Sequence, residues 1–191
     1  MMRGLQSFAI RPAGRHDIQP LRAAEDAAAQ RFRSIGMAWL AEAGVTPPAI
    51  VQRYIEAGTA LIAVPPRGGI AGFAFYEICG QTCYLAELSV VPEYSGRRLG
   101  AWIIERTAER ALSAGAAVMV LRTFRDVPWN APYYARLGFR PAEPGAEDRA
   151  PYTEPPLREI PSSEAAGGLD PDQRLFMEKP IGQRPAKASR T

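Results

Sequence analysis

Three apolar segments that follow one another closely restrict the fold of this chain more than any other feature. They are residues 59–64, 70–79 and 82–91, and connections of two to five residues separate them. Parallel strands need a crossover of a dozen residues or more, so connections this short join antiparallel neighbours. The pattern therefore predicts an antiparallel meander in the middle of the chain.

Helices are expected before this meander. Apolar positions from His16 to about Phe32 keep helical spacing, and a second helix is expected over residues 49–57. A short strand over residues 7–13 precedes the first helix.

The order of elements changes after the meander. A helix that ends near Ser113 is followed by a strand over residues 117–124, and strand, helix and strand in this order predict a parallel pair joined by a right-handed crossover. The sequence of residues 130–139 predicts a short helix with Asn130 as its N-cap. Residues 174–180 are expected to form the last strand.

Length and composition predict one domain over residues 1–180 of the 191, with a long loop-rich insertion at 141–172 and a disordered basic tail at 181–191. The net charge of +3 comes from dispersed basic residues. A mild, dispersed positive charge suits an anionic ligand, whereas a nucleic-acid-binding surface would be more concentrated. Nucleic acid is therefore not expected as a partner.

The two cysteines, Cys79 and Cys83, are interpreted as half-buried strand thiols, with a disulfide as the alternative. With two Cys and one His, a metal site is not expected. The N-terminus lacks the apolar run of a signal peptide, and no stretch of 18 apolar residues predicts a membrane span. The expected location is the cytoplasm, without membrane association.

A turn rich in Gly and Arg joins the last strand of the meander to the next helix. It reads Ser-Gly-Arg-Arg-Leu-Gly over residues 95–100. A helix start leaves backbone N–H groups without partners, and these donors together with the helix dipole favour an anion such as a diphosphate. Gly96 and Gly100 let the backbone approach a ligand, and two arginines add charge. A plain surface connection is the alternative.

Two other phosphate-binding loops do not fit this turn. A Walker loop ends in Gly-Lys-Ser/Thr, which is absent here. A dinucleotide fingerprint belongs to an early strand–helix repeat, whereas this turn follows an antiparallel meander.

Two motifs in the chain resemble those of the GCN5-related N-acetyltransferases. Residues 90–100, VVPEYSGRRLG, resemble the acetyl-CoA motif V-x-P-x-x-(Q/R)-G-x-G-(I/L)-(G/A) of that family. Residues 123–139 are similar to the family segment that ends in Y-x-x-L-G-F, and here they end in Tyr-Ala-Arg-Leu-Gly-Phe. The resemblance covers roughly residues 8–141.

This resemblance implies an α/β fold with a mixed, mainly antiparallel sheet of six to seven strands and helices on both faces. It implies an acyl-CoA-dependent N-acyltransferase, which moves an acetyl group from acetyl-CoA to a primary amine of a small molecule or peptide. Acetyl-CoA would be a co-substrate, with no metal. The acceptor amine is not identified by the sequence, and a homodimer is one arrangement that the sequence allows.

The resemblance also implies which residues contact the cofactor. These are Leu88, Val90, Ser95, Gly96, Arg97, Arg98, Leu99, Gly100, Ala101 and Asn130. Ser95 stands where the family has Gln or Arg, and Arg98 stands where it has Gly. A positive φ at residue 98 would strain an arginine by roughly 1 kcal/mol or more.

Two residues are candidates for catalysis. Glu87 is the one acid in the apolar strand 82–91, where a carboxylate suits the removal of a proton from an ammonium group; pairing with an arginine is the alternative. The resemblance implies that Tyr134 protonates the departing thiolate, and a packed aromatic residue is the alternative.

Two further classes of function remain open at this point. A degenerate acyl-CoA sensor would bind the cofactor without turnover, as the changes at Ser95 and Arg98 would allow. A toxin that acetylates aminoacyl-tRNA would need a basic track, and the dispersed charges argue against one.

Overall fold

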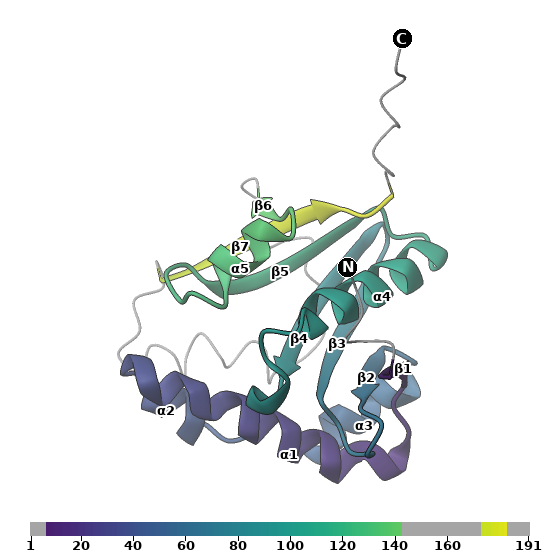
Figure 1. Ribbon diagram of the computed structural model, residues 1–191. Helices are drawn as coiled ribbons and strands as arrows, with labels where there is room; N and C mark the ends of the chain where they lie inside the picture. The colour runs from purple at the N-terminus through teal and green to yellow at the C-terminus, as the bar shows by residue number, and fades with distance from the viewer. Residues whose placement is uncertain (1–6, 143–172, 183–191) are drawn as a thin grey trace. The chain divides into compact units, whose positions relative to one another are not determined.

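The computed structural model describes residues 7–142 and 173–182 of the chain. Seven strands form one mixed sheet in the order β1-β2-β3-β4-β5-β7-β6 (Figure 1). The contacts divide the chain into two compact units, residues 1–77 with 85–107 and residues 78–84 with those from 108 onward. Each unit is described by itself below. The expectation of one domain over residues 1–180 stays a prediction.

The strands of the first unit confirm the first turn of the predicted meander. β1 (Ala9–Pro12), β2 (Ala60–Val64) and β3 (Gly72–Cys79) pair antiparallel, with Ile10 opposite Ala63 and Leu61 opposite Ala74. β4 (Thr82–Val90) follows β3 in the sheet. β2 is buried along nearly its whole length, which explains its almost uninterrupted run of apolar residues.

The helical region before the meander is more divided than the sequence predicts. In place of one helix over residues 16–32 there are a 3-10 turn (Arg15–Asp17), α1 (Ile18–Ala29) and a second 3-10 segment (Gln30–Ile35). α2 (Ala38–Glu42) was not expected, because five residues are too short for a periodic pattern. α3 (Pro48–Glu56) confirms the helix predicted at 49–57.

The core of the first unit lies between these helices and the strands. Leu21 and Ala24 of α1 and Val51 of α3 are buried in one cluster with β2 and β3 side chains. In the same cluster the ring of Tyr54 stacks on Phe75 with 4.6 Å between centroids. Burial of this apolar surface, at about 25 cal/mol per Å², is the main stabilising contribution to this unit.

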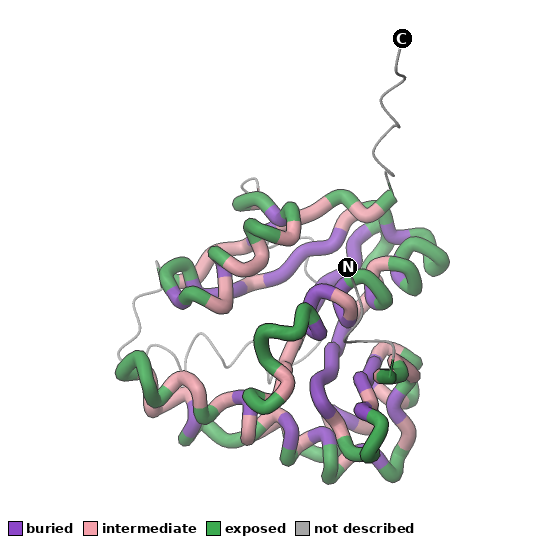
Figure 2. The backbone as a smooth tube through the Cα atoms, viewed as in Figure 1, coloured by how far each residue is buried: buried purple, intermediate pink, exposed green. Residues whose placement is uncertain are grey.

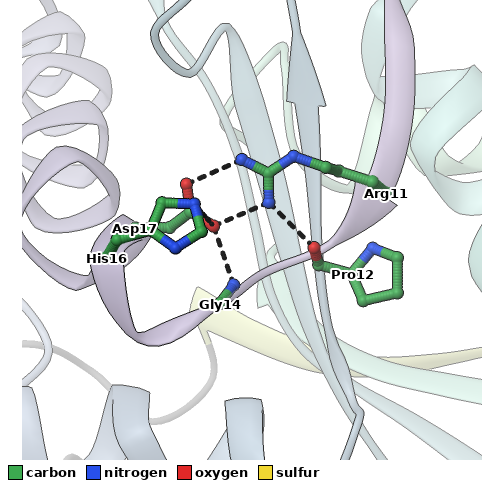
Figure 3. Close-up of polar contacts among 5 residues, drawn as sticks. All are labelled: Arg11, Pro12, Gly14, His16 and Asp17. Atoms are coloured by element: carbon green, nitrogen blue, oxygen red, sulfur yellow. Dashed lines mark hydrogen bonds and ion pairs between the residues drawn. The ribbon is translucent and has the colours of Figure 1, made fainter.

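A charged cluster fixes the passage from β1 to the first helical turn (Figure 3). The Arg11 guanidinium donates to both carboxylate oxygens of Asp17, at 2.7 and 2.8 Å, and the Gly14 backbone N–H donates to the same carboxylate at 2.7 Å. Asp17 is 5% exposed. The hydrogen bonds from Arg11 hold the pKa of Asp17 below its usual range.

The second unit contains the remaining strand pairs. β5 (Val118–Phe124) pairs antiparallel with β7 (Arg174–Pro180) from one end to the other, and β6 (Arg140–Pro141) pairs with β7. Residues 82–84 of β4 pair parallel with residues 118–120 of β5, which confirms the predicted parallel pair. Figure 2 shows β5 buried over most of its length. The last predicted strand, 174–180, has the predicted bounds.

Two helices complete the part of the chain that the structure describes. α4 (Leu99–Ser113) begins in the first unit and ends in the second, and α5 (Ala131–Arg136) belongs to the second. Among the described residues, no helix is both long and apolar enough to cross a membrane. Most of the predicted insertion at 141–172 and nearly all of the predicted tail at 181–191 lie outside the described residues.

The cysteines are both free thiols rather than a disulfide. Cys83 is buried and Cys79 is exposed, so the expectation of two half-buried thiols is wrong for both residues. Burial raises the pKa of the Cys83 thiol to about 12.

Candidate active site

The connection from β4 to α4 leaves a run of backbone N–H groups without acceptors among the described residues. A 3-10 turn (Pro92–Tyr94) follows β4, and the Ser95 N–H donates to the Pro92 carbonyl at 3.0 Å. The next such bond runs from Trp102 N–H to the Arg98 carbonyl at 3.1 Å. Within residues 7–142 and 173–182, the backbone N–H groups from Gly96 to Ala101 donate to no acceptor. These groups are the donors that the sequence predicted for a diphosphate.

Left-handed backbone at two positions shapes this connection. Gly96 has φ 74° and Arg98 has φ 62°. Among the described residues, Arg98 is the one non-glycine residue with positive φ. The positive φ considered for residue 98 is therefore present, and it costs about 1–2 kcal/mol because the Cβ crowds the following carbonyl.

The two arginines of the connection are exposed. The Arg97 guanidinium lies 5.7 Å from the centroid of the Tyr94 ring, and Tyr94 in turn meets the edge of Phe8 at 5.7 Å. This stacking holds the charge of Arg97 beside the free N–H groups. Arg98 forms no ion pair with a described residue.

The start of α4 is anchored by its buried side chains. Leu99 is 1% exposed and Ala101 is 5% exposed. These two predicted contact residues are therefore restricted to their main-chain groups. Their burial fixes the direction in which the N–H groups of the helix start point.

The end of β4 carries the predicted catalytic acid. Glu87 is half-buried, and its carboxylate accepts a hydrogen bond from the Ser89 hydroxyl at 2.7 Å. Leu88 and Val90, the predicted main-chain contacts, are also half-buried on this strand.

The backbone of this part of β4 lies very close to β3. A Cβ at Gly72 would lie 2.7 Å from the Ser89 carbonyl oxygen and 3.1 Å from Ile103 Cδ1. The Val91 N–H also donates to the Ala71 carbonyl at 2.9 Å. Gly72 therefore allows a separation of the two strands that any side chain would prevent.

A second carboxylate, which the sequence analysis missed, is affected by the charge of Glu87. Glu25 of α1 accepts hydrogen bonds from Thr46, at 3.0 Å from the backbone N–H and 2.8 Å from the hydroxyl. Burial first, and then the charge of Glu87, raise the pKa of Glu25 to about 7. A signal was present in the sequence, because Glu25 stands four residues after the buried Leu21, beside the apolar face of the helix.

The second unit holds the remaining predicted site residues on α5. Tyr134 is half-buried, and its ring lies 5.6 Å from that of Phe139. Asn130 is the N-cap residue, as predicted, and its carbonyl accepts from the Tyr134 N–H at 2.9 Å. The capping is by the backbone alone, since the Asn130 side chain makes no capping hydrogen bond.

The predicted site residues are thus divided between the two units. The first unit contains Glu25 as well as Glu87, Leu88, Val90 and residues 95–101. Asn130 and Tyr134 belong to the second. In the parts of the chain that the structure describes, no group of His, Cys, Asp or Glu side chains has the arrangement of a metal site.

Comparison with known proteins shows which families and folds this chain resembles. Residues 56–141 match the family model described as "Acetyltransferase (GNAT) domain". The fold is similar to that of PaiA N-acetyltransferase from Thermoplasma acidophilum in complex with coenzyme A, with a TM-score of 0.66 and 16% identity over 92% of this chain and 99% of that one.

Two further solved structures are also similar. The ribosomal-protein-S18-alanine N-acetyltransferase from Escherichia coli has a TM-score of 0.58 and 16% identity, over 94% of this chain and 97% of that one. A GNAT family acetyltransferase from Brucella melitensis in complex with acetyl-CoA has a TM-score of 0.51 and 25% identity, over 70% of this chain and 82% of that one. The mixed seven-stranded sheet and the match over residues 56–141 make this part of the chain similar to the GNAT acetyltransferase domain.

Proposed function

We propose that this chain transfers an acetyl group from acetyl-CoA to a primary amine of a small molecule or peptide. The observation that carries the proposal is the set of backbone N–H groups from Gly96 to Ala101, which have no acceptor among the described residues at the start of α4. The CoA complexes of similar folds support the choice of an acyl-CoA as the anion.

The connection before α4 fits a diphosphate. Its free N–H groups and the helix dipole favour negative charge, and Gly96 has no heavy atom within 4 Å of where its Cβ would be. Arg97 and Arg98 supply two cations that hydrogen bond to phosphate oxygens. The main-chain groups of Leu88 and Val90 are proposed to pair with the amide-containing arm of the cofactor, and Asn130 with the same molecule.

The chemistry divides between the cofactor and the side chains. Bound acetyl-CoA supplies a thioester-activated acetyl group. Glu87 takes a proton from the ammonium form of the acceptor, because only the neutral amine has a lone pair for attack. Tyr134 gives a proton to the departing thiolate, for which it must lie within hydrogen-bond reach of the sulfur atom.

A matched pair of glycine variants tests the cofactor site. Gly96 and Gly68 are both exposed turn glycines with positive φ, at 74° and 81°, and both have open space at the Cβ position. We expect G96D to weaken acetyl-CoA binding at least tenfold in calorimetry, because it places a carboxylate at the diphosphate site. G68D carries the same backbone strain and should bind as wild type does. Equal affinity of G96D and G68D for acetyl-CoA would contradict a diphosphate site at this connection.

The alternative of an acyl-CoA sensor is favoured by the left-handed Arg98, since this strained residue occupies the binding connection itself. A panel of amines, assayed for the release of free CoA thiol, separates the two functions. Turnover of any amine supports the enzyme, whereas acetyl-CoA binding with no turnover across the panel supports the sensor.

A further inference from the structure

The C-terminal end of α5 forms a closed turn against Tyr134. Leu137 is the C-cap of the helix, and Gly138 follows it with φ 89°. The Phe139 N–H donates to the Tyr134 carbonyl at 3.1 Å, and the Gly138 N–H donates to the Ala135 carbonyl at 3.0 Å. These two bonds define a Schellman motif, which brings the residue after the left-handed position onto the last turn of the helix. The rings of Phe139 and Tyr134 make that contact, with 5.6 Å between centroids.

Lys179 of β7 binds this turn from outside the helix. Its Nζ donates to the Leu137 carbonyl at 2.7 Å, so it satisfies a carbonyl at the helix end. The same Nζ lies 5.7 Å from the centroid of the Phe139 ring. Its Cε lies 3.8 Å from the position that a Cβ of Gly138 would occupy. One side chain therefore contacts the three consecutive residues that close α5.

The backbone of Lys179 is held by the sheet. β7 pairs with β5 along its length, and Lys179 stands opposite Met119, which is fully buried. On its other side β7 pairs with β6, where Glu178 stands opposite Arg140. α5 packs against β7 (Figure 1). Because a helix of six residues has little stability of its own, its position depends on such contacts.

We propose that Lys179 is a positioning residue for Tyr134. By holding Leu137 and Phe139, it fixes the Tyr134 ring in the orientation from which the phenol gives its proton to the departing thiolate. This inference rests on the proposed function, in which Tyr134 is the acid.

The proton transfer explains why the orientation of the ring matters. The O–H bond of the Tyr134 phenol breaks, and its electron pair stays on oxygen. An S–H bond forms with an electron pair of the thiolate. The transfer needs the phenol oxygen within hydrogen-bond reach of the sulfur atom, so a small displacement of the ring lowers its rate.

The positioning is tested first in the free protein, without substrate. Nuclear Overhauser effects between the ring protons of Tyr134 and Phe139 report the edge-on contact of the two rings. K179M keeps an unbranched stem but removes the donor and the charge, so these signals should weaken about twofold or more as the turn frays. K179Q, whose side chain is too short to reach the carbonyl, should show the same loss. K179R keeps a charged donor and should preserve the signals.

R136M is the matched control for the loss of a cation. Arg136 is exposed on α5 itself, and its guanidinium lies 6.0 Å from the centroid of the Tyr133 ring. The change removes a cation beside the neighbouring tyrosine and leaves the bond of Lys179 in place. The contact of Tyr134 with Phe139 should therefore stay as in wild type. A loss in R136M as large as in K179M would contradict a specific role of Lys179.

The role in the reaction is tested by steady-state kinetics with an amine that the panel identifies. K179M should lower kcat about tenfold, because the acid is misplaced. KM for acetyl-CoA should stay within about twofold of wild type, because the proposed diphosphate site lies in the first unit. K179R should restore kcat to within about threefold of wild type. In the Y134F background K179M should have no further effect on kcat, whereas a merely structural role would lower kcat in both backgrounds.

The outcomes separate this inference from the proposed function. Ring contacts between Tyr134 and Phe139 that are unchanged in K179M and K179Q overturn the inference, whether or not any amine is acetylated. If the contacts are lost and no amine is acetylated, the positioning is supported and the proposed function fails. If K179M lowers kcat equally in the wild-type and Y134F backgrounds, the role of Lys179 in the reaction is overturned while the acetyltransferase proposal stays intact.

Discussion

The first unit contains two junctions at which a strand leads into a helical segment. They differ in whether the described residues supply an acceptor for the backbone N–H groups of the junction. At the junction from β1 to α1, the Asp17 carboxylate accepts the Gly14 N–H and both branches of the Arg11 guanidinium (Figure 3). At the junction from β4 to α4, the N–H groups from Gly96 to Ala101 have no acceptor within the described residues. The first junction contains its own anion, whereas the second is proposed to bind an external one.

This difference shows why a helix start alone does not identify a ligand site. Both junctions have glycine and arginine nearby, and a sequence pattern restricted to those residue types would select both. What separates them is Asp17, a buried carboxylate whose interactions stabilise the first junction. The second junction has Arg97 and Arg98 beside its unpaired donors, and its acidic residue, Glu93, lies in the 3-10 turn before them. The donors and the two arginines therefore favour an external anion.

The largest expected effect comes from giving the second junction a carboxylate of its own. R98D should weaken acetyl-CoA binding by about 100-fold, which corresponds to about 2.7 kcal/mol, because it replaces a cation with an anion at the proposed diphosphate site. R98G removes the cation alone and should weaken binding by about tenfold or less. Calorimetry on the two variants measures the difference, and similar losses in both would contradict a specific effect of the carboxylate.

A smaller effect is expected from disrupting the first junction. D17N should lower the free energy of unfolding by about 2 kcal/mol, less than for a fully buried pair because the Arg11 side chain is 40% exposed. Since the pKa of Asp17 is lowered in the folded state, its contribution is present above the ordinary pKa of about 3.9. The contribution is lost as pH falls through the folded-state pKa.

Urea unfolding of wild type and D17N at several pH values measures this contribution. The two curves should differ most above pH 5 and converge in strong acid. A difference that stays constant down to the lowest pH would show that the charge of Asp17 is not what stabilises the turn.

The smallest expected effect concerns strain at the second junction. R98G should raise the free energy of unfolding by about 1 kcal/mol, because glycine adopts φ 62° without the Cβ crowding that arginine has there. R97G, at the exposed neighbour without a positive φ, should not stabilise the protein. Thermal unfolding of both variants makes the comparison, and equal shifts would argue against strain at residue 98.

The sequence predicted the strands better than it predicted the surroundings of Glu87. Strand bounds are visible in local apolar runs, as at 174–180, which match β7. The connection at 95–101 is a local motif. The effect of the Glu87 charge on the pKa of Glu25 depends on how α1 and β4 are arranged in the fold, and local spacing contains no information on that arrangement.

Short elements were missed for a different reason. α2 spans five residues after the left-handed Gly36, and β6 spans two, so neither offers enough residues for a period to be recognised. The helix predicted over 16–32 ends early as α-helix because its last turn tightens into a 3-10 segment. Such tightening depends on packing rather than on residue preference.

The close approach of Gly72 to the Ser89 carbonyl limits how this chain can diverge over evolutionary time. Even alanine at residue 72 would press β4 away from β3 in the region of Glu87. Substitution of this glycine is therefore disfavoured, although its backbone angles are ordinary. Neighbouring core positions such as Phe73 tolerate exchange among large apolar side chains far better. Descendants that retain this fold should therefore keep a glycine here while the aromatic residues around it vary.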